Sequence, residues 1–146
     1  MNGFRNIVDE LIAQLRRDRV KPYFLIVEDN EGDRLLMENE IRSAGFIFKS
    51  VRNGEEAKRA LESHIDPEMP NFSIVLLDLM LPGMSGIDLL RIIREKDPGL
   101  HVIIVTGAID PSLLERARGL GYFGCVMKPL DRKTVENIVE KHRLER

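Results

Sequence analysis

The segment from Ser73 to Gly86 constrains the fold of this 146-residue chain more than any other. Its sequence is Ser-Ile-Val-Leu-Leu-Asp-Leu-Met-Leu-Pro-Gly-Met-Ser-Gly, so four large apolar residues directly precede Asp78. A short continuous apolar run of this kind favours a strand that is buried on both faces. Asp78 then stands at the C-terminal end of the strand, where a charge costs free energy unless a partner compensates it. The rest of the chain is therefore expected to supply partners for this carboxylate.

Short apolar runs and helical patterns alternate along the chain from residue 23. The predicted strands are Tyr23–Val27, Phe46–Val51, Ser73–Leu77, His101–Thr106 and Cys125–Met127. The predicted helices are Asp33–Ala44, Asn53–His64, Gly86–Lys96, Pro111–Leu120 and Asp131–Arg143, and Asp66–Pro70 is a predicted loop. Strict alternation of this kind predicts an α/β fold, a doubly wound five-stranded parallel sheet with helices on both faces.

Residues 1–21 depart from this alternation and are predicted to be an N-terminal amphipathic helix and a link, ahead of a domain at residues 22–146. Six apolar residues recur at helical spacing, namely Phe4, Ile7, Val8, Leu11, Ile12 and Leu15. A helix of this length is marginal in water unless its apolar stripe is buried. The sequence leaves three partners open: the chain's own domain, a second copy in a homodimer, or an upstream domain.

The composition excludes several classes of protein. A net charge of −2 gives no indication of nucleic-acid binding. No apolar run approaches the roughly 20 residues that a membrane span needs, and the charged N-terminus lacks a signal-peptide core. The single cysteine, Cys125, cannot form an internal disulfide. We therefore expect a cytoplasmic protein that binds neither nucleic acid nor membrane.

Polar side chains stand where four of the predicted strands end. Glu28 and Asp29 follow the first strand, Asp78 follows the third, Thr106 ends the fourth and Lys128 follows the fifth. Function in such sheets gathers at the carboxyl ends of the strands, so these groups are expected to share one crevice. Clustered carboxylates need a cation, and hard oxygen ligands suit Mg²⁺. A carboxylate that accepts a phosphoryl group needs access, a metal and a fixed positive charge, which this set would supply.

In this order and at these spacings, the elements resemble the receiver domain of two-component response regulators. The resemblance covers roughly Tyr23 to Arg143 and rests on four elements: Val27-Glu28-Asp29, Leu77-Asp78-Leu-Met-Leu-Pro82 with Gly86, Val105-Thr106-Gly107, and Met127-Lys128-Pro129. It implies the strand order 2-1-3-4-5. It also implies a phosphoacceptor switch, not an enzyme that acts on a separate substrate.

The resemblance further implies a role for each site residue. Asp78 would be the phosphoacceptor, and Thr106 and Lys128 would contact the phosphoryl group. The implied Mg²⁺ ligands are Glu28 (through water), Asp29, Asp78 and the backbone carbonyl of Met80. The Lys128–Pro129 bond would be cis. The implied partners are a sensor histidine kinase or histidine phosphotransfer protein upstream and an effector protein downstream.

Some positions depart from the family's pattern or stand outside it. Cys125, three residues before Lys128, occupies the position where the family usually has an aromatic residue that moves on phosphorylation, and we expect it to be buried. Met80 and Ala108 occupy positions that tune the lifetime of the phosphate in the family. The three histidines, His64, His101 and His142, are predicted to lie far apart and to bind no metal.

Two other functions are compatible with the sequence. A phosphatase or phosphotransferase with an aspartyl-phosphate intermediate would commonly carry a second acid two residues after the nucleophile, where this chain has Met80. A constitutive scaffold with a receiver fold would respond neither to Mg²⁺ nor to a phosphoryl analogue.

Overall fold

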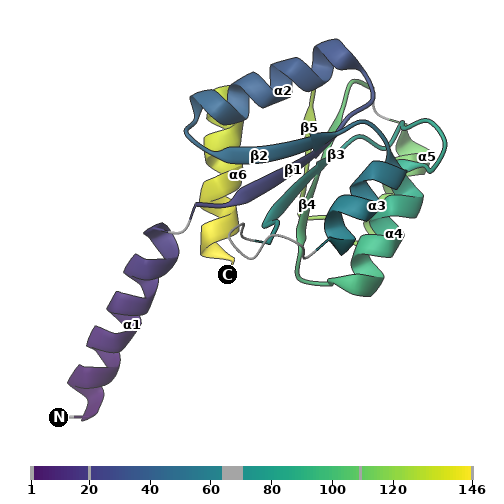
Figure 1. The fold of residues 1–146 in the computed structure, drawn as a ribbon. Coiled ribbons are helices and arrows are strands. Elements are labelled where there is room, and N and C mark those ends of the chain that lie inside the picture. The colour runs from purple at the N-terminus through teal and green to yellow at the C-terminus, as the bar shows by residue number, and fades with distance from the viewer. Residues whose placement is uncertain (1, 20, 64–70, 109, 146) are drawn as a thin grey trace.

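A computed structural model describes residues 2–19, 21–63, 71–108 and 110–145 (Figure 1). The strands are β1 (Tyr23–Val27), β2 (Ile47–Val51), β3 (Ile74–Leu77), β4 (His101–Thr106) and β5 (Gly124–Met127). The helices are α1 (Asn2–Arg19), α2 (Glu31–Ser43), α3 (Gly54–Glu62), α4 (Gly86–Lys96), α5 (Pro111–Leu120) and α6 (Arg132–Leu144). The predicted alternation of strands and helices is confirmed. His64 and the predicted loop Asp66–Pro70 lie outside the described residues.

The strands form one parallel sheet in the order β2-β1-β3-β4-β5, as the resemblance implied. Every residue of β1 and β3 is buried, which explains their continuous apolar sequences. β2 lies at an edge, and its first four residues alternate between exposed and half-buried. From β1 the chain passes outward to β2 and then returns across β1 to β3, so the direction of strand order reverses between β1 and β3. Ligand sites in such sheets lie at this reversal.

Two hydrophobic cores lie on the two faces of the sheet. Figure 1 shows α2 and α6 over one face and α3, α4 and α5 over the other. Successive strand residues point to opposite faces, so Leu25 and Val27 join one core, whereas Phe24 and Ile26 join the other. Burial on both faces fixes the register of the central strands, because a slip of one residue would exchange the faces. The carboxyl ends of the strands are therefore held firmly in place.

Polar residues set the start of each helix that follows a strand. The side chains of five N-cap residues accept a backbone N–H from the first turn: Asn30, Asn53, Ser85, Asp110 and Asp131. These caps place most predicted boundaries within two residues. The start predicted at Asp33 was late, because Asn30 caps α2 and its helical turn begins at Glu31.

Two of the three histidines lie together, so the prediction that all lie far apart was wrong. His101 begins β4 and His142 lies in the last turn of α6, and their Nδ1 atoms are 2.7 Å apart in a hydrogen bond. The His101 ring also stacks on Phe123, with ring centroids 3.7 Å apart. Sequence spacing could not reveal this pair, because the fold alone brings the start of β4 against the end of α6.

α1 projects away from the sheet and its covering helices (Figure 1). Its apolar side chains Ile7, Leu11, Ile12 and Leu15 are exposed, and none of them belongs to either described core. No helix in the described part of the chain is long and apolar enough to cross a membrane. The division of the chain at residues 21 and 22 stays a prediction.

Candidate functional site

The pairing of β1 with β3 places two acids side by side. Val27 lies opposite Leu77 in the sheet, so the next residues, Glu28 and Asp78, leave neighbouring strands at the same level. The Asp78 N–H donates to the carbonyl of Val27 over 3.3 Å, which extends the pairing by one residue. Glu28 and Asp78 are both buried. This edge of the sheet therefore concentrates negative charge in a place with little water.

Lys128 reaches this pair of acids from β5. Its backbone N–H donates to the carbonyl of Thr106 over 2.8 Å, which holds the residue beside the end of β4. Its ammonium donates to Asp78 Oδ2 over 2.8 Å and also to Glu28 Oε1. The Lys128–Pro129 bond is cis, as predicted. The structure thus brings Glu28, Asp78 and Lys128 together as the sequence indicated.

Sequence reasoning missed a fourth carboxylate at the site. Lys128 Nζ also donates to Asp33 Oδ2 over 3.0 Å, and Asp33 lies in the first turn of α2. A signal for it was present, because side chains in a helix lean toward its N-terminus and so toward the end of β1. Asp33 was read only as the start of a helix.

Burial and neighbouring charges set the protonation of the central pair. Burial raises the pKa of Glu28 to about 7, against the hydrogen bond from Lys128, and the charge of Asp78 adds to the rise. Burial alone would lower the pKa of Lys128, but hydrogen bonds to Asp78, Glu28 and Asp33 outweigh it and raise that pKa. Lys128 is therefore a fixed positive charge, and Glu28 takes up a proton at a higher pH than an exposed glutamate does.

The acids fit a divalent cation. Glu28, Asp29 and Asp78 each offer a carboxylate oxygen, and these oxygens all lie within 4.8 Å of one another. Glu28 Oε2 is buried and has no hydrogen-bond partner in the described part of the chain, so it is available to a metal ion. An all-oxygen set with one exposed member, Asp29, suits Mg²⁺, which keeps several waters. Met80 contacts Asp78 through its N–H, at 2.9 Å from Oδ1, and its predicted carbonyl ligation stays a prediction.

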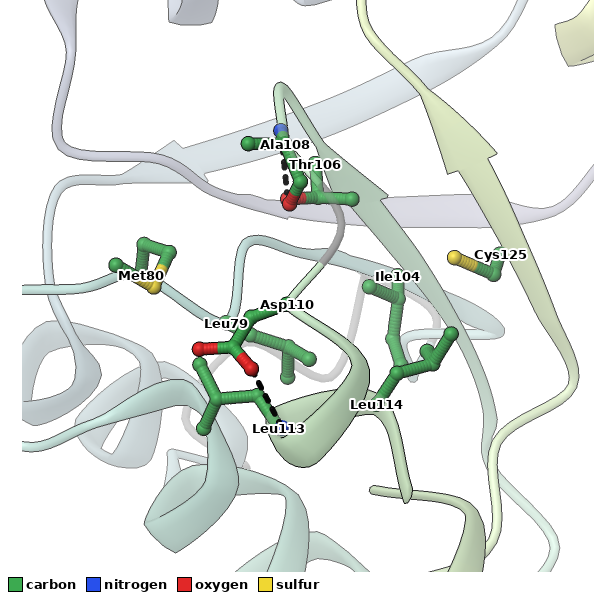
Figure 2. Close-up of a pocket in the computed structure, with 9 residues that line it drawn as sticks. All are labelled: Leu79, Met80, Ile104, Thr106, Ala108, Asp110, Leu113, Leu114 and Cys125. Atoms are coloured by element: carbon green, nitrogen blue, oxygen red, sulfur yellow. Dashed lines mark hydrogen bonds between the residues drawn. The ribbon is translucent and has the colours of Figure 1, made fainter. Parts of the chain in front are cut away.

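Thr106 lies beside this site in a neighbouring pocket (Figure 2). Its hydroxyl is buried and donates to the carbonyl of Ala108 over 2.8 Å. This pocket is small and partly open to solvent. Its lining residues are Leu79, Met80, Ile104, Thr106, Ala108, Asp110, Leu113, Leu114 and Cys125. The described structure does not pair the Thr106 hydroxyl with Asp78, so its contact with a phosphoryl group stays a prediction.

Cys125 lines this pocket as an exposed residue, so the prediction that it is buried was wrong. β5 is an edge strand, and exposed residues alternate along it with half-buried ones. Val126, the next residue, packs against one of the cores instead. A short apolar run could not distinguish this edge strand from a buried one.

The fold and the site thus define a doubly wound α/β domain. It has an acidic crevice and an opposing lysine where its strand order reverses. The profile of the response regulator receiver domain matches residues 24–140. The chain therefore belongs to the response regulator receiver domain family of two-component systems.

Known relatives agree with this assignment. Sporulation initiation phosphotransferase F of Bacillus subtilis (strain 168) is 30% identical over 118 residues, which are 81% of this chain and 90% of that protein. DNA-binding transcriptional regulator NtrC of Escherichia coli (strain K12) is 32% identical over 116 residues. A cyclic di-GMP phosphodiesterase of Thermotoga maritima is 33% identical over 107 residues. The chain spans 24% of NtrC and 27% of the phosphodiesterase, about a quarter of each.

Solved structures show the same fold. A CheY-like receiver domain protein from Methanospirillum hungatei JF-1 is 21% identical and has a TM-score of 0.75, covering 86% of this chain and 96% of that chain. The BeF3-activated DrrB receiver domain is 25% identical and has a TM-score of 0.71, covering 87% of this chain and all of that one (100%).

Proposed function

We propose that this chain is a phosphorylation-dependent switch and that Asp78 accepts the phosphoryl group from a sensor histidine kinase or a histidine phosphotransfer protein. The arrangement of Asp78 carries this proposal. One of its carboxylate oxygens is held by Met80 N–H and the other by Lys128, and two further acids lie beside it. A buried carboxylate with a fixed cation and a metal set is equipped to bear a phosphoryl group.

The transfer forms one bond and breaks another. An oxygen of the Asp78 carboxylate attacks phosphorus, the P–N bond to the donor's histidine breaks, and the released imidazole takes up a proton. The product is an acyl phosphate on Asp78. Hydrolysis returns the switch to its unmodified state: water attacks phosphorus, the P–O bond to Asp78 breaks, and inorganic phosphate leaves. Lys128 stabilises the phosphoryl oxygens as their negative charge develops.

Mg²⁺ would be held by Asp29, Asp78 and the Met80 carbonyl, with Glu28 acting through a bound water, and it would neutralise phosphoryl oxygens during transfer. Glu28 would be ionised beside the cation, because a nearby positive charge favours the charged form of a carboxyl group. The negative charges of ionised Glu28 and Asp29 would then attract the cation. Lys128 would keep its positive charge and could interact with the phosphoryl oxygens.

Thr106 connects the site to the surface in this proposal. Its hydroxyl has one proton, which it now gives to the Ala108 carbonyl, so donation to a phosphoryl oxygen requires release of Ala108. That exchange would move Ala108, which lines the pocket of Figure 2. An effector protein would bind the altered surface.

The protein is further proposed to act in the cytoplasm. This chain is proposed to bind neither nucleic acid nor a membrane.

Acetyl phosphate with Mg²⁺ tests the proposal on the natural chain. Intact-mass measurement should show one added phosphoryl group per chain, and peptide mapping should place it on the segment that contains Asp78. Excess chelator should abolish the addition, because the acids then lack the cation that neutralises the phosphoryl oxygens. Absence of added mass would favour the scaffold, and rapid turnover of a phosphomonoester would favour the phosphatase.

We also propose that α1 pairs with α1 of a second copy. Val8, Leu11 and Leu15 follow a 3-4 spacing, which forms the seam of a coiled coil. Ile7 and Ile12 flank this seam and are five residues apart, so in a parallel pair Ile7 of one copy would meet Ile12 of the other. Both isoleucines are exposed in the single chain. A second copy would thus cover both the seam residues and the two flanking isoleucines.

Size-exclusion chromatography with light scattering tests this pairing. The natural chain should be a dimer at tens of micromolar, and Leu11→Glu should be a monomer, because two buried carboxylates would face each other in the seam. Leu144→Glu is the matched control, since Leu144 is 79% exposed on α6 and should leave the dimer intact. A monomeric natural chain would overturn the proposal.

A further inference from the structure

Asp33 is the feature of the site that the proposed function does not use. Its carboxylate contacts Lys128 at 3.0 Å, yet it does not belong to the metal set of Glu28, Asp29 and Asp78. It therefore holds the lysine and not the cation. The backbone of Asp33 is itself fixed, because its N–H donates to the Asn30 side chain over 2.9 Å at the start of α2.

The donors of Lys128 are fully used in this state. An ammonium group has three N–H donors, and Lys128 donates them to Glu28, Asp33 and Asp78. A phosphoryl oxygen on Asp78 can gain a hydrogen bond from Lys128 only if one of these carboxylates gives one up. The contact between the phosphoryl group and Lys128 is therefore an exchange.

Asp33 is the partner that exchanges at least cost. The side chain of Asp33 is 41% exposed, whereas those of Glu28 and Asp78 are 1% and 9% exposed. A released Asp33 can be solvated by water, but a released Glu28 would be a buried charge without a partner. The negative charge of Asp33 also repels an arriving phosphoryl group while it attracts an arriving cation.

We propose that Asp33 is a positioning residue that competes with the phosphoryl group for Lys128. In the unmodified chain it draws the ammonium toward α2, and phosphorylation of Asp78 breaks this contact and frees the Asp33 side chain. Asp33 thereby weakens the phosphorylated state and favours Mg²⁺ in the unmodified one. This inference rests on the proposed function of Asp78.

Calorimetric titration of Asp33→Asn with two ligands tests the competition. Beryllofluoride, a phosphoryl analogue, should bind at saturating Mg²⁺ about two- to fivefold more tightly than to the natural chain, the range expected for a partly exposed ion pair. Mg²⁺ alone should bind at least about twofold more weakly, because one attracting charge is lost and the neutral amide, which can still accept a hydrogen bond, holds Lys128 less strongly than the carboxylate does. A merely structural role for Asp33 would not shift the two affinities in opposite directions.

Glu31→Gln is the matched control, since Glu31 lies in the same first turn of α2 and its side chain makes no hydrogen bond or ion pair with any other residue that the structure describes. It removes the same charge from the same helix end. Equal behaviour of Asp33→Asn and Glu31→Gln, or loss of affinity for both ligands in Asp33→Asn, would overturn the inference and leave phosphorylation of Asp78 standing. A natural chain that takes up neither a phosphoryl group nor beryllofluoride would overturn both.

Discussion

Asp78→Asn is expected to leave the chain folded and to take phosphoryl incorporation from one group per chain to none. The amide has the size of the carboxylate and can still accept a hydrogen bond from Lys128, so the fold keeps the contact that now joins Lys128 to Asp78 Oδ2 at 2.8 Å. The amide oxygen is not an anionic nucleophile and cannot form the acyl phosphate. Intact mass after incubation with acetyl phosphate and Mg²⁺ measures the loss.

Asp88→Asn is the control for Asp78→Asn. Asp88 is an exposed acid in the first turn of α4, where it pairs with Arg91 at 3.4 Å, and it lies outside the crevice. Its replacement should leave phosphoryl incorporation at one group per chain. Equal incorporation into Asp78→Asn and the natural chain would contradict the assignment of Asp78.

Gly86→Ala is expected to lower the free energy of unfolding by about 3 kcal/mol, at the upper end of what overpacking costs. A Cβ at Gly86 would lie 2.5 Å from Leu79 Cα and 2.6 Å from the Asp78 carbonyl oxygen. Both are backbone atoms, which cannot turn away as a flexible side chain would. Since one of these atoms belongs to Asp78 and the other to the next residue, their displacement would also move Asp78. Phosphoryl incorporation should therefore slow. Chemical denaturation and the rate of mass addition measure the two effects.

Gly119→Ala is the matched control for Gly86→Ala. Gly119 lies in α5, and a Cβ there would have no heavy atom within 4 Å. Alanine should stabilise the helix by about 0.5 kcal/mol, because glycine loses more backbone entropy on folding. If Gly86→Ala matches this small gain, the close packing of α4 on the loop after β3 is not what holds Asp78.

Most of the fold could be predicted because the local signals agreed with one another. The buried strands read as apolar runs, and an Asn, Asp or Ser capped each following helix. Parallel strands end on one edge, so Glu28, Asp78 and Lys128 could be placed together from their positions alone. Strand order came from the family resemblance, since alternation of strands and helices does not specify it.

Three features were not predicted from local patterns. Asp33 reaches Lys128 across 95 residues of sequence, and its position read only as a helix start. His101 and His142 meet because β4 begins where α6 ends. Cys125 is exposed because its strand lies at the edge of the sheet. Each depends on which elements are neighbours in space, and periodicity reports only the faces of a single element.

The segment from Ser73 to Gly86 separates what the sequence predicts from what depends on the tertiary structure. By itself the sequence determined a buried strand that delivers Asp78 to its carboxyl end, because apolar residues must leave water and a charge must stay at the boundary. Only the tertiary structure decided how that charge is shared. It set Glu28 beside Asp78 and gave Lys128 three acids to hold. Hydrogen bonds depend on distance and direction, and packing of the whole chain sets both.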